Sequence, residues 1–337
     1  MVSLPHELTL EIIKKLGEPE NPLAYLLPKG NIKTLSNLCR VSVAFKDLTE
    51  PILYSRINIT NDNIGAFTFT MLPRVAPSES NTSTHSACRY AALVKSLAFI
   101  GFLTRSEPNE INQIVNILRV PKPALDRLLL DVVVFTPMHT IWPSELHVAI
   151  RETQGLKEFA STFQEWDPSK GAGVTLQPWP SASSQTLRRI ALSHPVTPIA
   201  AEIIALLPHT ESFVFNQPPL DIASEGEKFL SHFGLTDEIQ SNREVIWILN
   251  SKELGRGTLV AFDSALTSAL EGNPKEVRTR MKMSVIEQRP PPDDLWTFAQ
   301  TFFIEKLLDG TAWTAERTFD DYLQRIRDDD YQQQEEF

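Results

Sequence analysis

LPHELTLEIIKKL (residues 4–16) and LSNLCRVSVAFKDLTEPILY (residues 35–54) are the two stretches around which the rest of the chain can be organised. At about 100° per residue, Leu4, Pro5, Leu8, Ile12 and Leu16 fall within roughly 120° of one another, on one face of a helix. Ile13 widens that face, while Leu10 lies well away from it. A short helix that is apolar on two sides must contact two surfaces, so we expect the first stretch to do so.

The second stretch has helical spacing as well, because its apolar residues recur at every third or fourth position. Pro51 is expected to end the run, since it has no N–H to donate. Ser42 is suited to cap a new turn, so the stretch predicts two short helices. The residues that share this spacing are Leu35, Leu38, Val41, Phe45 and Leu48.

Together the two stretches resemble an F-box. The resemblance rests on LPxEL at residues 4–8, with Ile12 and Leu16 after it, and on L..LC.VS..F..L..P.LY at residues 35–54. It implies a three-helix module, residues 1–56, that docks on the Skp adaptor of a cullin-RING (SCF-type) ubiquitin ligase. The adaptor contacts that it implies are Leu4, Pro5, Leu8, Ile12, Leu16, Leu35, Leu38, Val41, Phe45 and Leu48.

Two features depart from the usual F-box pattern. Phe45 stands where many F-boxes have tryptophan, and residues 17–34 form a longer connection than usual. This insertion is either a loop or an obstacle to docking. In the alternative interpretation, the opening helices pack only on the protein's own second domain, as the N-terminal cap of an interaction scaffold that belongs to no ligase.

Composition narrows the classes of function. The 337 residues carry a formal net charge of -10, so we expect neither nucleic acid nor an anionic membrane as a partner. Two cysteines cannot form a disulfide scaffold in a chain of this length. The N-terminus does not have the pattern of a signal peptide, and no run of 18 apolar residues occurs. These features predict a soluble intracellular protein, cytoplasmic or nuclear.

From residue 94 a repeat appears, each unit reading apolar-x-x-apolar-x-apolar. Four units start 31 residues apart, at Val94, Leu125, Leu156 and Leu187. Weaker units follow at Thr210 (with Phe213 and Phe215), Arg243 (with Ile246 and Ile248) and Arg278 (with Met281 and Met283). Helical patterns lie between them, at residues 109–118, 144–153, 198–207, 225–233 and 263–270. One strand and one helix in each period resembles a degenerate leucine-rich-repeat solenoid.

This resemblance is imperfect, and it leaves a second α/β architecture open. Phe102, Val133 and Gln164 stand where leucine-rich repeats place Asn or Cys, and the fourth interval shrinks to 23 residues. Alternation of strands and helices is also typical of a doubly wound sheet. The near-constant spacing favours the solenoid.

In a solenoid, the residues between the apolar anchors of each strand face the concave side, where partners bind. These positions hold small, apolar and charged residues of both signs, which indicates a protein surface. The alternative for the tryptophans is ordinary core. The residues predicted to contact a substrate are Arg127, Glu158, Trp166, Arg189 and Trp247.

The C-terminal region breaks the repeat at Pro290-Pro291-Pro292. Helical patterns at residues 293–308 and 315–326 predict a cap over the last repeat or, alternatively, a partner-binding helix. We therefore expect an α/β protein with an F-box (1–56), a strand and linker (57–92, with an exposed stretch at 73–86), a leucine-rich-repeat-like domain (93–288), a helical C-terminal cap (289–327) and an acidic tail (328–337).

No catalytic, metal-binding or cofactor-binding motif is present. The seven histidines form no HxxxH pair, and glycine patterns for phosphate binding and a GxSxG motif do not occur. A spatially assembled active site of unrecognised class stays open. The sequence thus predicts a non-catalytic adaptor without cofactor or metal, which presents a protein substrate to an SCF-type ligase through the Skp adaptor and its cullin.

Overall fold

The computed structural model describes the helices and strands of both halves of the chain. The described residues are 5–71, 90–104, 108–120, 124–134, 144–162, 185–193, 207, 209–216, 243–250, 281–286, 295–314, 317–318, 321 and 324. The chain divides into two compact units. The first comprises Met1–Phe159, Pro178–Thr186 and Leu307–Thr311, and the second comprises Ala160–Gln177, Leu187–Lys306 and Ala312–Phe337. The domain boundaries drawn from the sequence stay a prediction.

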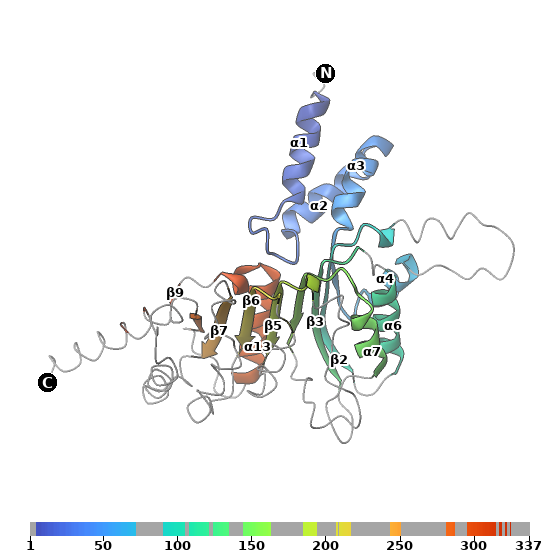
Figure 1. Cartoon of the computed structure of the whole chain (residues 1–337). Coiled ribbons are helices and arrows are strands. Elements are labelled where there is room, and N and C mark those ends of the chain that lie inside the picture. The colour runs from blue at the N-terminus through green and yellow to red at the C-terminus, as the bar shows by residue number, and fades with distance from the viewer. Residues whose placement is uncertain are drawn as a thin grey trace. The chain divides into compact units, whose positions relative to one another are not determined.

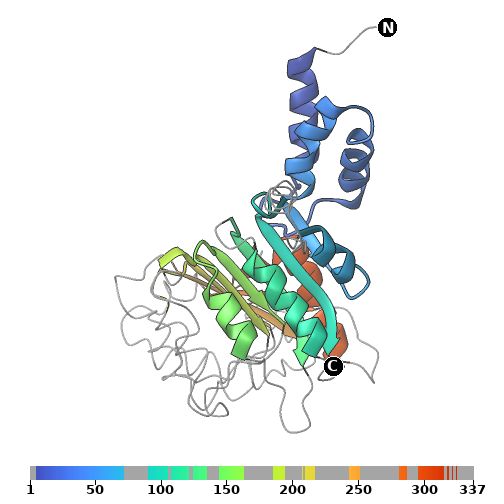
Figure 2. The same ribbon diagram turned by 90° about the vertical axis from the view of Figure 1, so that its right-hand side faces the viewer.

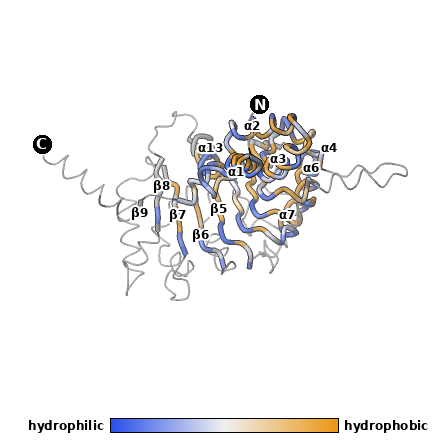
Figure 3. Tube along the Cα trace, turned by 90° about the horizontal axis from the view of Figure 1, so that it is seen from above, coloured by the Kyte–Doolittle hydropathy of each residue, from blue (hydrophilic) through white to orange (hydrophobic). Residues whose placement is uncertain are grey.

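Three helices pack together at the N-terminus: α1 (His6–Gly17), α2 (Lys29–Leu38) and α3 (Val43–Leu53) (Figure 1). Apolar residues cluster along α1 and α3 (Figure 3). The buried centre of this cluster consists of Ile13, Leu27 and Leu35, with further apolar residues of the three helices packed around it. We call α1, α2 and α3 the N-terminal module.

The break between α2 and α3 follows the predicted capping. The Ser42 side chain accepts a hydrogen bond from the Phe45 N–H, 3.2 Å between Oγ and N, and this satisfies a free donor of the first turn. The prediction that Pro51 ends the helix is wrong. Pro51 lies inside the last turn of α3, where it removes one hydrogen bond, while Tyr54 N–H still reaches the Glu50 carbonyl.

The first unit contains a parallel sheet that begins directly after α3. Its strands are β1 (Arg56–Ile59), β2 (Ser96–Thr104) and β3 (Arg127–Val134). The next strand, β4 (Glu158–Ser161), begins in the first unit, and its last two residues belong to the second. Ser96 pairs with Arg127 and Leu97 with Leu128, which matches the predicted spacing of 31 residues. Strand neighbours in the sheet are neighbours in the chain. The α/β class is therefore confirmed.

Helices cover one face of this sheet. They are α4 (Ile64–Met71), α6 (Pro108–Arg119) and α7 (Ser144–Arg151), and Figures 1 and 2 show them side by side along β2 and β3. The sequence predicted α6 and α7. It did not predict α4, which lies in the region expected to be strand and linker.

The same backbone hydrogen-bond pattern recurs at the start of successive strands. The Lys95 carbonyl accepts hydrogen bonds from the N–H groups of both Asp126 and Arg127, and the Asp126 carbonyl accepts from Lys157 and Glu158. The carbonyl of Ser55 does the same one strand earlier. Each strand is thus aligned with the previous one at the same edge of the sheet.

The second unit repeats this pattern with four parallel strands: β5 (Arg189–Ser193), β6 (Ser212–Asn216), β7 (Glu244–Asn250) and β8 (Met281–Ile286). Here too, sheet order follows chain order. A doubly wound sheet reverses its strand order at a switch point, and neither unit shows a reversal among its described strands.

The register of β7 corrects one predicted repeat. Phe213 pairs with Val245 and Phe215 with Trp247, so these two residues take the places predicted for Ile246 and Ile248. Paired residues of parallel strands point to the same face. The unit is therefore shifted by one residue, and Glu244 and Ile246 occupy the face predicted for Trp247.

The C-terminal region differs in part from the predicted helical cap. α13 (Leu295–Leu308) forms as expected. In the second predicted helix, Asp321 and Gln324 are helical, but Arg317–Thr318 form β9, which pairs antiparallel with β8. Within the second unit, the Gln300 side chain of α13 donates to the Thr162 hydroxyl beside β4. The strand that follows β8 in the sheet is thus β9. A short 3-10 helix, η2 (Thr311–Trp313), lies between α13 and β9.

Several predictions fall outside the described residues. They are the exposed stretch at 73–86, the helices at 225–233 and 263–270, nearly all of the helix at 198–207 and the tail at 328–337. Of the helices that the structure describes, none is both long enough and apolar enough to span a membrane.

Candidate docking surface and the segment behind it

Apolar side chains on the outside of the N-terminal module form the candidate site. Seven large apolar side chains are exposed in the part of the chain that the structure describes, and five of them lie within residues 8–43. Two of them, Leu8 and Ile12, lie four residues apart on the same face of α1, and an exposed apolar face is typical of a surface that binds another protein. We call these five residues the apolar patch: Leu8, Ile12, Ile32, Val41 and Val43.

The single apolar face predicted for α1 has two different surroundings in the structure. Ile13 is 2% exposed and belongs to the core of the module, whereas its neighbour Ile12 is 50% exposed. Leu16 packs against the same core, and Leu8 lies on the open side with Ile12. The core of the module is therefore filled without Leu8 and Ile12.

The structure separates the predicted adaptor contacts into three groups. Pro5, Leu8, Ile12 and Val41 are exposed, and Leu16, Leu38, Phe45 and Leu48 are partly buried against the module core. The assignment of Leu35 to a contact surface is wrong, because its side chain is 0% exposed in that core. Leu4 lies outside the described residues.

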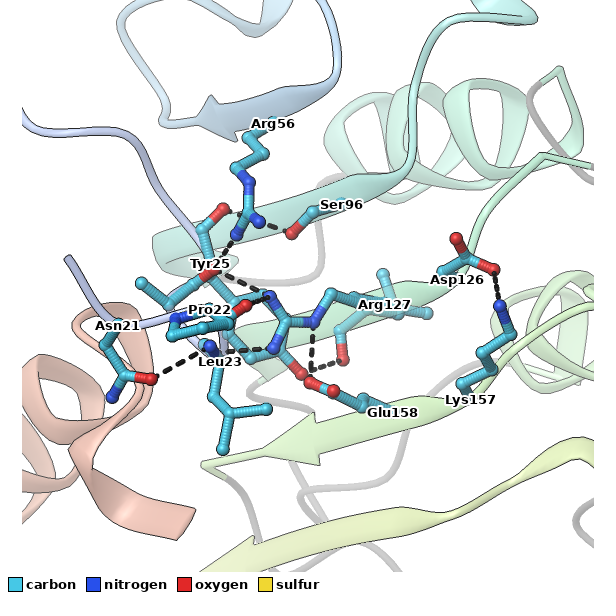
Figure 4. A network of polar contacts seen from close by, with 12 residues as sticks. Asn21, Pro22, Leu23, Tyr25, Arg56, Ser96, Asp126, Arg127, Lys157 and Glu158 are labelled. Carbon is cyan, nitrogen blue, oxygen red and sulfur yellow. Dashed lines mark hydrogen bonds and ion pairs between the residues drawn. The ribbon is translucent and has the colours of Figure 1, made fainter. Parts of the chain in front are cut away.

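Behind the module, the long connection between α1 and α2 is held on the strands of the first unit. Arg127, at the start of β3, donates to two successive carbonyls: Nη2 lies 2.6 Å from the Leu23 oxygen and Nη1 lies 2.7 Å from the Ala24 oxygen (Figure 4). The Arg127 Nε bonds to the Glu158 carboxylate on β4, at 2.6 Å. A planar guanidinium presents its donors in a fixed fork, which suits this simultaneous use.

Tyr25 is the buried aromatic residue of the connection. Its hydroxyl donates to the Leu128 carbonyl (3.4 Å), and the Ser96 hydroxyl donates to the Tyr25 carbonyl (3.1 Å). The Arg127 guanidinium lies over the Tyr25 ring, 5.1 Å from its centroid. Arg56 of β1 also donates to the Ala24 carbonyl. Residues of three successive strands therefore hold one short segment, residues 21–27, which we call the clasp.

The strands bring two guanidinium groups, Arg56 and Arg127, close to the Glu158 carboxylate. Burial lowers the pKa of the Arg56 guanidinium, and the positive charge of Arg127 lowers it further, while the Glu158 carboxylate acts in the opposite direction. Arg127 and Glu158 have side-chain exposures of 10% and 5%. A buried ion pair of this kind is stable only when its remaining donors are bonded, and here the clasp carbonyls bond them.

The turn after α13 contacts the clasp as well. The Tyr25 N–H donates to the Leu308 carbonyl at 2.9 Å. Gly310 has φ +80°, and a Cβ at this position would lie 2.4 Å from the Ala24 nitrogen. Because real Cβ atoms essentially never come so close, only glycine fits here without displacing the clasp.

These contacts correct the predicted substrate surface. Arg127 and Glu158 lie on the same strand face, as predicted, but they are buried and hold the chain's own clasp, so the prediction of an open contact surface at these two residues is wrong. Arg189 is half-buried on β5, in register with Ser212, and Trp166 lies outside the described residues.

Trp247 is also misassigned. Its ring centroid lies 5.4 Å from that of Phe215, its strand neighbour, and the side chain is 4% exposed. The alternative interpretation of Trp247 as core is the right one. In the sequence of β7, Val245, Trp247 and Leu249 alternate just as Ile246 and Ile248 do. Sequence spacing alone therefore could not decide on which face of the strand Trp247 lies.

Comparisons with protein-family models, with curated proteins and with solved structures find no match to this chain. Within the described residues, no three His, Cys, Asp or Glu side chains are grouped so that they could hold a metal ion. The apolar patch and the clasp are thus the two features on which a function can be argued.

Proposed function

We propose that this protein is a non-catalytic adaptor that recruits a target protein to an SCF-type ubiquitin ligase, with the N-terminal module docking on a Skp-type adaptor. The observation that carries the proposal is the exposure of Leu8 and Ile12 on a helix whose other apolar side already fills the module core. These two residues belong to the motif that resembles an F-box.

The chemistry of the apolar patch supports a protein partner. Its aliphatic side chains offer hydrophobic burial at roughly 25 cal/mol per Å². The cores of protein interfaces are depleted in charge, whereas phosphate-binding surfaces are rich in Lys and Arg. Leu8 and Ile12 come from α1, Ile32 comes from α2, Val41 precedes α3 and Val43 is its first residue, so a partner that covered all five would contact several segments of the module.

For the strand region, we propose a leucine-rich-repeat-like solenoid that carries the target protein. Two observations support it: the pairing of Ser96 with Arg127 at the repeat spacing, and the agreement of sheet order with chain order in each unit. The strand face at Arg127 is occupied by the clasp. We therefore place target recognition on other surfaces of the repeat domain.

Co-expression with a Skp-type adaptor tests the proposal. The wild-type chain should co-purify with the adaptor, and Leu8→Asp with Ile12→Asp should abolish co-purification, because two carboxylates would be placed in an apolar interface. The control is Val148→Asp, which alters another exposed aliphatic side chain, on α7. Adaptor binding that survives the double substitution, or no binding by the wild type, contradicts the proposal and favours a scaffold outside any ligase.

A further inference from the structure

The clasp deepens the proposed function, because it determines how the docking module is held. Leu27 is 3% exposed in the core of the N-terminal module, and Tyr25, two residues earlier, is 0% exposed against the strand face. A chain of two residues spans at most about 7 Å. A displacement of α1 and α2 from β2 and β3 would thus pull either Leu27 or Tyr25 out of its buried position.

On its other side, the module is joined to the sheet by a simple chain connection. α3 ends at Leu53, and β1 begins at Arg56. Additional contacts are made there by Tyr90, whose ring packs on Tyr54 with 4.6 Å between centroids and whose hydroxyl donates to Glu50. The clasp holds the opposite side, that of α1 and α2, and α1 carries Leu8 and Ile12 of the apolar patch.

We infer that residues 21–27 are a positioning element, which fixes the orientation of the docking module on the first strands, and that Arg127 and Gly310 are the residues that close it. Arg127 holds the Leu23 and Ala24 carbonyls from the strand side. The turn at Leu308–Gly310 contacts the same segment from residues near the C-terminal end of the chain.

This arrangement makes the position of the N-terminal module depend on residues almost 300 positions later in the sequence. The Leu308 carbonyl, which accepts from Tyr25, lies at the end of α13. The clasp closes only when the chain is present as far as Gly310. Its consequence for ubiquitin transfer rests on the proposed function, but the clasp itself is a property of the free chain.

The test measures the distance between the module and the sheet in the full chain without adaptor. Nitroxide labels are placed at Lys33→Cys on α2 and Asn116→Cys on α6, both exposed, with Cys39→Ser and Cys88→Ser to remove the native thiols. Double electron–electron resonance should give one narrow distance distribution. The double variant Arg127→Met with Glu158→Met should broaden this distribution at least twofold, because the hydrogen bonds from Arg127 to the Leu23 and Ala24 carbonyls are lost. Both residues are replaced so that neither member of the ion pair is left buried without the other.

The control variant is Arg119→Met, which removes the same side chain from a half-exposed ion pair with Glu152 that does not touch the clasp. Its distribution should match that of the wild type. Hydrogen exchange of the β2 and β3 amides shows whether the strands stay folded. If they do not in the double variant, Gly310→Ala decides, because it disturbs the clasp and leaves the strand residues unchanged.

An unchanged narrow distribution in a variant with intact strands overturns the clasp. Adaptor binding is measured separately on the same variants. Failure of wild-type binding with a narrow wild-type distribution removes the proposed function and leaves the clasp. A broad wild-type distance distribution with normal adaptor binding removes the clasp and leaves the proposed function.

Discussion

Tyr25 and Leu27 lie two residues apart and are buried in different places, Tyr25 on the strand face beneath the Leu128 carbonyl and Leu27 in the core of the N-terminal module. Through this relationship, the segment between α1 and α2 becomes part of two packing arrangements. Neither packing arrangement can separate from the other without pulling Tyr25 or Leu27 out of its buried position, because the two-residue backbone between them is too short to stretch.

Neighbouring isoleucines on α1 should separate stability from docking. Ile13→Ala removes a side chain that is 2% exposed, so we expect it to lower the free energy of unfolding by roughly 2–5 kcal/mol. Ile12→Ala, at a half-exposed position, should change it by less than about 0.5 kcal/mol. Urea unfolding measures both values.

Ile12→Ala should lower the affinity for the adaptor, whereas Ile13→Ala should change this affinity little as long as the module is folded. Equal effects of the two substitutions on both measurements would mean that α1 has no separate outer face.

Arg127 and Glu158 should be strongly coupled in their effect on stability. Arg127→Met leaves a buried carboxylate without its charge partner, and Glu158→Met leaves a buried guanidinium, so each single substitution should cost about 3–5 kcal/mol. The double substitution should cost less than the sum, because neither member of the Arg127–Glu158 pair is left buried without the other. A double-mutant cycle in urea measures this coupling, and additive costs would contradict a shared buried site.

Two glycines with positive φ provide a matched comparison. Gly101 has φ +73°, and nothing lies within 4 Å of an added Cβ, whereas at Gly310, with φ +80°, the Ala24 nitrogen lies 2.4 Å from it. Gly101→Ala should cost roughly 1–2 kcal/mol from backbone conformation alone. Gly310→Ala should cost more, since the clasp must also move. Thermal unfolding of both variants checks the order, and a larger loss for Gly101→Ala would show that the close approach at Gly310 is unimportant.

The helices and strands were predictable where periodicity is local. Helices α6 and α7 follow from apolar spacing, Ser42 marks the start of α3, and the register between β2 and β3 follows from the 31-residue repeat. Each of these features is determined by residues close in sequence or by a regular interval. The register of β7 was not predictable in this way, because apolar residues occupy both of its faces.

The clasp could not be predicted, for a different physical reason. Arg127 makes its contacts with backbone carbonyls of Leu23 and Ala24, more than 100 residues earlier, and a carbonyl leaves no signature in the sequence. The insertion at residues 17–34 was the visible signal, but its length does not say what it contacts. A basic residue between apolar strand anchors is equally compatible with an open surface and with a buried ion pair.

His147 should make stability depend on pH in a defined direction. Burial on α7 lowers the pKa of its imidazole below the ordinary value of about 6.5, and the positive charge of Arg151 lowers it further. Between the folded and unfolded pKa values, the unfolded state binds more protons, so the free energy of unfolding rises with pH and levels off above about 6.5. Acidification through this window removes that stability. His147→Gln should abolish this component, which urea unfolding at a series of pH values measures as the difference between the two chains. An NMR titration of the His147 ring should give a pKa below 6.5, and a value at or above it, or parallel stability curves for the two chains, would show that the imidazole is not buried in its neutral form.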